Sequence, residues 1–228
     1  GRSALQAKKF LASIGIDVVG EFVVPWNPID STASMQGVKS KNPDLVFLMH
    51  HAGGAAMIAK DMRKVGLTPK VPLIGVWYIL DSTTIKLAGE AGEGMMSVSP
   101  YGLSTEDKPG LKEMAEWYAD IHGTKEIASY PYYSCGYIYA KLGTDAIRMA
   151  YEKGGWPVTG QDVYNVLASL KDYDMGGLTA PVTFTGTGAT SRRGSSSVRI
   201  LQLQKGKLAP ITDWFNVPFV KVDGTWAE

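Results

Sequence analysis

Two short apolar runs, separated by an amphipathic helical pattern, decide which folds are open to this chain. The segments LVFLM (45–49) and VPLIGV (71–76) are nearly unbroken apolar runs of strand length. Strands of a parallel sheet are buried on both faces, so they read as continuous apolar runs rather than alternating ones. Their alternation with helical patterns predicts βαβ units, and therefore an α/β fold built on a parallel sheet flanked by helices.

The first half of the chain repeats this strand and helix cycle. A helix is expected from Ser3 to about Ile14, with Gly15 as its stop, and Asp30 or Ser31 can cap a weaker helix toward Lys41. A parallel sheet is therefore expected within residues 17–98. Its remaining elements would be an extended, valine-rich stretch at 17–24, helices at 55–65, 81–88 and 106–121, and a strand at 94–98.

The second half has a different character. A long helix at 132–152 and a shorter one at 161–170 are followed by β signals only. Strands are expected at 181–185, 198–204 and 208–215. The sequence Lys205-Gly206-Lys207 between the last two is typical of a hairpin turn.

Composition excludes several classes of protein. The 228 residues are 45% hydrophobic and 20% charged, which is typical of a globular protein. A formal net charge of +1 without long charged runs leaves no basic stripe for nucleic acid. The single cysteine, Cys135, rules out an intramolecular disulfide and a multi-cysteine metal site, and we expect it to be a buried small residue. No apolar run reaches the length of a membrane span.

Signatures of catalysis are missing from the sequence. The glycine-rich stretches AGG (52–54) and GTG (186–188) form neither GxGxxG after a strand nor a P-loop, and there is no GxSxG motif. The adjacent histidines His50 and His51 are poorly spaced for zinc. We therefore expect no enzymatic activity, no cofactor and no metal.

Six short sequence segments occur in the order found in one protein family. They are GRSALQAKKFLASIGIDVVGEF, IDSTASMQGVKSKNPDLVFLM, MRKVGLTPKVPLIG, AGEAGEGMMSVSPY, YYSCGYIYAKLGTDAIRMA and GKLAPITDWF. By these segments the chain resembles the periplasmic (type I) solute-binding proteins of ABC transporters, of the branched-chain amino acid type. The resemblance covers nearly the whole chain, and no single segment is sufficient for it.

This resemblance implies two lobes that clamp a small organic ligand, joined by hinge crossovers. It places 1–121 with about 198–228 in ligand-binding lobe two, about 131–185 in a remnant of lobe one, and the crossovers at about 122–130 and 186–197. Lobe one would be incomplete, its N-terminal segment being missing, so the chain is expected to be a fragment that cannot bind ligand tightly by itself.

The family also implies partners and a location. The expected partners are a small-molecule ligand and the membrane permease of an ABC importer, in the periplasm or, lipid-anchored, outside the cell. The same fold also serves as the ligand-sensing domain of receptors and regulators, which is the alternative function. A membrane helix or an effector domain elsewhere in the protein would favour the sensor.

Ligands of open α/β sheets lie beyond the carboxyl ends of the strands, which points to the loops there. After the strand at 45–49, a loop of His50, His51, Ala52, Gly53 and Gly54 either touches the ligand, with at most one imidazole, or is a tight turn. After the strand at 94–98, Tyr101 either lines the cleft or covers the sheet edge.

Two further candidates come from the aligned positions of the family. Trp77, followed by Tyr78, stands where amino-acid-binding members carry the acid that pairs with the ligand's ammonium. It is either a cation–π or apolar wall of the cleft or a core residue, and Asp81 is another possible partner for an amine. Tyr132 stands where an aromatic of lobe one reaches the ligand, or it packs at the hinge. Arg192 and Arg193, in a glycine- and serine-rich loop, are expected to be solvated.

Overall fold

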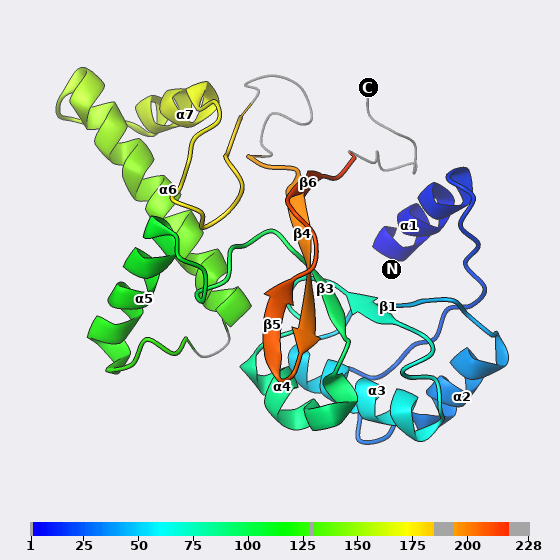
Figure 1. The fold of residues 1–228 in the computed structure, drawn as a ribbon. Coiled ribbons are helices and arrows are strands. Elements are labelled where there is room, and N and C mark those ends of the chain that lie inside the picture. The colour runs from blue at the N-terminus through cyan, green and yellow to red at the C-terminus, as the bar shows by residue number, and fades with distance from the viewer. Residues whose placement is uncertain (1, 128–129, 185–193, 219–228) are drawn as a thin grey trace. The chain divides into compact units, whose positions relative to one another are not determined.

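The computed structural model describes residues 2–127, 130–184 and 194–218 (Figure 1). The chain forms two compact units. The first consists of residues 1–98 and 200–228, and the second of residues 99–199. The parallel-sheet architecture with flanking helices is the one predicted from the alternation of apolar runs.

The first unit is built on the sheet. Its strands follow the order β1-β2-β3-β4-β5, with β6 paired to β4; β1, β2 and β3 are parallel, and β4 and β5 form the antiparallel hairpin predicted around Lys205–Lys207. The strands are β1 (Val46–Leu48), β2 (Leu73–Gly75), β3 (Met96–Ser99), β4 (Ser197–Gln204), β5 (Lys207–Pro210) and β6 (Phe215–Asn216).

Helices of the first unit cover the sheet and supply most of its core. Figure 1 shows α2, α3 and α4 together on one side of the strands. Ile58 and Met62 of α3 are fully buried against Leu73 of β2 and Ile79, which follows it. The elements are α1 (Arg2–Ser13), α2 (Thr32–Ser40), α3 (Ala52–Lys64), α4 (Ser82–Ala88) and the short 3-10 helix η1 (Gly89–Gly92).

The sheet was expected to lie within residues 17–98, and this expectation is wrong for residues 17–24. Residues 17–24 form no strand, and among the described residues β1 pairs with β2 alone. Phe22 is partly exposed and Val23 is 92% exposed, so this valine-rich stretch buries little apolar surface. A strand needs a ladder partner, and the described part of the chain gives 17–24 none, although Val24 packs against the core.

The second unit is mainly helical. It contains α5 (Pro109–His122), α6 (Tyr130–Gly154) and α7 (Gly160–Ser169). Leu111 and Met114 of α5, Ile138 of α6 and Leu178 form its buried core. The lobe boundary expected at residue 121 places α5 in the same lobe as the first half of the chain. In the structure the apolar face of α5 packs within this second unit instead. The assignment of the two units to lobes stays a prediction.

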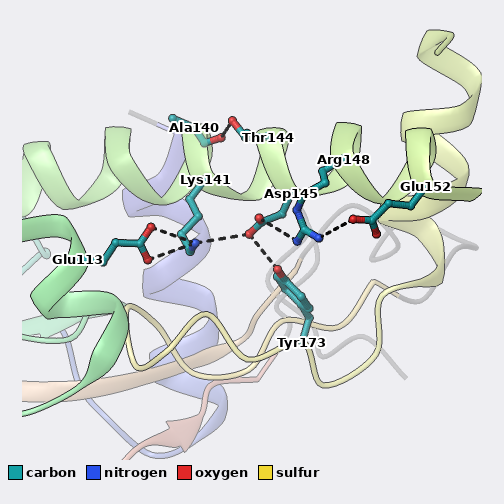
Figure 2. A network of polar contacts seen from close by, with 8 residues as sticks. All are labelled: Glu113, Ala140, Lys141, Thr144, Asp145, Arg148, Glu152 and Tyr173. Atoms are coloured by element: carbon teal, nitrogen blue, oxygen red, sulfur yellow. Dashed lines mark hydrogen bonds and ion pairs between the residues drawn. The ribbon is translucent and has the colours of Figure 1, made fainter. Parts of the chain in front are cut away.

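A polar network ties α5, α6 and the segment after α7 together (Figure 2). Lys141 lies between Glu113, at 3.3 Å, and Asp145, at 3.8 Å. Asp145 also accepts a hydrogen bond from the Tyr173 hydroxyl at 2.8 Å and pairs with Arg148. Each charge in the network therefore faces an opposite charge, which is what partial burial requires.

The other differences from the sequence expectations are local. The strand expected at 181–185 is a single bridge between Tyr173 and Val182. Thr185, Arg192 and Arg193, with most of the second expected crossover, lie outside the described residues. Among the described residues, no helix is long and apolar enough to cross a membrane.

Candidate functional site

The carboxyl ends of β1 and β2 bring two predicted segments to one edge of the sheet. The strands are parallel and in register, with Leu48 opposite Gly75. The residues that follow them, His50 and Trp77, are therefore neighbours at that edge. The parallel strand β3 also ends at this edge, with Ser99. The common edge expected for the three segments is therefore present for the first two, and the place of the third, 99–101, which belongs to the second unit, stays a prediction.

His50 and His51 are held by hydrogen bonds to the backbone of a segment 25 residues earlier. The buried His50 ring contacts the carbonyl oxygen of Pro25 through Nε2 at 2.9 Å and accepts the backbone N–H of His51 at Nδ1, at 3.0 Å. Because Nδ1 accepts, Nε2 is the donor, which assigns the tautomer of His50. Nε2 of His51 bonds the carbonyl of Trp26. Both imidazoles are thus locked in place.

The expected loop is shorter than the sequence suggested. Helix α3 begins at Ala52, so Ala52 and Gly53 belong to its first turn and His51 is the N-cap residue. Glycine is needed here, because a Cβ on Gly54 would overlap Cε1 and Nδ1 of His50. The AGG sequence therefore lets a buried imidazole lie directly on a helix backbone.

Sequence reasoning missed Trp26. Its ring lies 5.4 Å from that of His50, nearly parallel at 19°, and 4.7 Å from that of His51. The side chain is nonetheless 63% exposed. Trp26 follows the apolar stretch 17–24 as His50 follows β1, and that position after an apolar run could have revealed it.

Trp77 and Tyr78 form an edge-to-face aromatic pair with ring centroids 4.9 Å apart. Both are partly buried, unlike Ile79 and Leu80 directly after them, which are fully buried core residues. Asp81 is buried and caps α4 by accepting the N–H of Thr84 at 2.9 Å. Oδ1 of this carboxylate therefore serves the helix start, and a contact of Asp81 with a ligand amine stays a prediction.

Tyr101 and Tyr132 belong to the second unit. The Tyr101 ring packs against the buried cluster of that unit, and burial, with the neighbouring Cys135 thiol, raises the pKa of its phenol far above the ordinary range. Tyr132 is exposed in the first turn of α6. Beside it, the Tyr130 hydroxyl donates to the carbonyl of Gly102, and burial raises the pKa of that phenol. A ligand contact by Tyr101 or Tyr132 stays a prediction.

The chemistry of this sheet edge is that of aromatic faces and backbone groups. In the described part of the chain, no group of three histidine, cysteine or acidic side chains is placed to hold a metal ion. The edge presents indole, phenol and imidazole rings, which suit apolar or planar parts of a ligand.

A family model described as "Periplasmic binding protein" matches residues 2–207. The chain therefore belongs to the periplasmic binding protein family, as the six sequence segments indicated. No curated protein matches the sequence significantly.

Solved structures of ABC transporter proteins share the fold. A branched-chain amino acid ABC transporter protein from Thermus thermophilus, with bound valine, is 26% identical, with a TM-score of 0.83 over 95% of this chain and 58% of that one. A substrate-binding protein from Aeropyrum pernix is 23% identical, with a TM-score of 0.75 over 95% of this chain and 56% of that one.

A third similar structure has a different ligand class in its description. It is a fatty acid ABC transporter substrate-binding protein from Thermomonospora curvata, 21% identical, with a TM-score of 0.75 over 95% of this chain and 55% of that one. The chain thus spans little more than half the length of these solved structures.

Proposed function

We propose that this chain is the greater part of an extracytoplasmic solute-binding protein that serves an ABC importer and clamps a small organic ligand between two lobes. The observation that carries the proposal is the aromatic edge at the ends of parallel strands, in a chain of the periplasmic binding protein family. The mechanism is hinge closure, in which the lobes swing together and the closed form is recognised by the membrane permease.

The ligand in this proposal has an apolar or aromatic body and a carboxylate. The family resemblance places Trp77 where amino-acid binders carry an acid, and Asp81 is buried, with its Oδ1 capping α4. A buried ammonium is met best by a carboxylate, and His50, Trp77 and Tyr78, the described residues at this edge, are not acidic. A carboxylate can instead be met by backbone N–H groups.

The ligands named for two of the similar structures share features with this ligand class. The Thermus protein holds valine, and the Thermomonospora protein is described as a fatty acid transporter protein. Both ligands combine an apolar body with a carboxylate, and only valine carries an amine. The aliphatic amino acids are therefore the runner-up ligands.

The test is a binding panel followed by recovery of the ligand. Leucine, valine, phenylacetate, hexanoate and small amides are titrated into isotope-labelled protein, with binding followed by NMR into the millimolar range. That range matters because the chain spans about half of its structural relatives. Saturable shifts at the β1 and β2 ends, with the ligand recovered chemically unchanged, support a binding protein. Turnover of the ligand, or no binding by any compound, contradicts it.

A further inference from the structure

We propose that Trp26 is a specificity-determining residue of this site, whose indole face selects ligands with a planar, unsaturated body. The inference rests on the proposed function and names the part of the ligand that the edge recognises. Trp26 belongs to none of the segments predicted to bind, and its ring contacts those of His50 and His51 at the edge.

The indole is anchored although it is exposed. The backbone on which it is carried is fixed by two hydrogen bonds, from His50 to the Pro25 carbonyl and from His51 to the Trp26 carbonyl. The ring itself stacks on the buried His50 imidazole at 19°. A tryptophan that is 63% exposed normally loses rotamer freedom when a ligand covers it, and here much of that loss has already occurred.

The support beneath the indole is itself rigid. His50 is buried with both ring nitrogens occupied, and it lies on the backbone of α3 where Gly54 leaves room for it. His51 is the N-cap residue of the same helix. The sequence elements Pro25-Trp26, His50-His51 and Gly53-Gly54 therefore act together to present one aromatic face.

The same contacts argue against a metal site. Three of the four imidazole nitrogens of His50 and His51 bond backbone groups, which leaves one ring nitrogen for coordination. A structural or catalytic zinc needs at least three protein ligands. The cluster is therefore suited to stacking, and its preference should follow the planarity of the ligand rather than its charge.

The experiment compares phenylacetate with cyclohexylacetate, which share a carboxylate and a six-membered ring but differ in planarity. Both are titrated by NMR into the wild-type chain, Trp26→Leu, Trp26→Phe and Trp117→Leu. Trp117 is a similarly exposed tryptophan on α5, outside the site, so its variant is the matched control. A ring stacked on an aromatic face gains roughly tenfold in affinity over one that only buries area.

The wild-type chain and Trp117→Leu are expected to prefer phenylacetate about tenfold. Trp26→Leu is expected to lose this preference, and Trp26→Phe to keep part of it. His51→Ala should shift the indole resonances of Trp26 without ligand, and lower the preference, because His51 acts as a positioning residue. Since Trp26 is exposed, an unchanged spectrum elsewhere confirms that the Trp26→Leu chain is folded.

Equal preference in wild type and Trp26→Leu would overturn the role of Trp26 while leaving the binding function intact. Binding of valine or leucine, with neither ring compound bound, would also overturn it and leave the proposed function standing. No binding of any compound would contradict both proposals.

Discussion

The carboxylate of Asp61 in α3 accepts both the backbone N–H and the hydroxyl of Ser31, each at 2.7 Å. Ser31 is the N-cap residue of α2, but its side chain makes no capping bond within its own helix. A buried negative charge from a helix 30 residues away thus stands at the N-terminus of α2, where the helix dipole favours it. The contact fixes the packing of α2 on α3.

Replacement of Asp61 by alanine is expected to lower the free energy of unfolding by about 3 kcal/mol, because two buried donors of Ser31 lose a charged acceptor. Urea denaturation followed by circular dichroism measures the change. Asp30→Ala is the matched control, since Asp30 accepts the N–H of Thr32 at the same helix end but is exposed. A larger loss in the Asp30 variant than in the Asp61 variant would contradict the interpretation.

Gly54→Ala is expected to destabilise the chain by about 2 kcal/mol, because the added methyl group overlaps the buried imidazole of His50. Its NMR spectrum should also show displaced Trp26 and His51 resonances, since His50 supports both rings. Gly136→Ala in α6 is the control. Space is open around Gly136, so alanine there should stabilise the helix by about 0.5–1 kcal/mol. Equal effects of the two substitutions would refute the steric argument.

The sequence predicts most of the elements but few of the contacts between them. Apolar runs and caps located β1, β2, α3 and the hairpin closely, because those signals are local. The expectation that residues 17–24 belong to the sheet was wrong, because a strand depends on a partner strand. No local sequence pattern reveals whether such a partner is present.

The candidate site shows the same division between local and distant information. His50 and Trp77 could be found because each follows a recognisable strand. The position of Trp26 after an apolar run gives only a weak signal, and Asp61 gives none, since the roles of both depend on contacts with residues 24 to 30 positions away. A single sequence carries no record of which distant residues meet.

Acid should weaken the pair formed by Glu106 and the buried Arg199. Burial alone would raise the pKa of Glu106, but hydrogen bonds from Arg199 and from the Leu103 N–H outweigh it and lower the pKa. A lowered folded pKa gives stability that is fully present above the unfolded pKa of about 4.3 and is lost as the pH falls through the folded pKa.

Glu106→Gln is therefore expected to lower the free energy of unfolding at pH 7 by about 2 kcal/mol, less than for a fully buried pair because Glu106 remains 27% exposed. The difference from wild type should shrink below about pH 4. Urea denaturation at pH 7 and pH 3.5 measures both values. Glu90→Gln, which breaks the surface pair with Arg63, is the control and should change stability little at either pH.

The Tyr173 phenol should report the charge of Asp145 (Figure 2). Burial, the hydrogen bond to Asp145 and the Asp145 charge together raise the pKa of Tyr173 to about 12. Asp145→Asn should lower this pKa only part of the way to its ordinary value, because burial remains. Arg148→Gln removes a charge that opposes the shift, so it should raise the pKa further. Carbon-13 NMR of the tyrosine Cζ resolves both changes, and shifts of the same sign would contradict the assignment.

Trp77 offers a test of the proposed ligand class, because the family resemblance predicts that it stands where amino-acid binders carry a carboxylate. Its partly buried ring, paired with Tyr78 at the end of β2, provides apolar area but no negative charge.

Trp77→Ala is expected to weaken phenylacetate binding about tenfold, since a large aromatic wall is lost. Trp77→Glu is expected to weaken it at least as much, because two carboxylates then face each other, and to strengthen leucine binding by supplying a partner for the ammonium. NMR titrations of the two ligands measure these changes, with Trp117→Ala as the exposed control. Leucine binding that is tight in wild type and unchanged by either substitution would show that the amine is met elsewhere, and that the chain binds aliphatic amino acids.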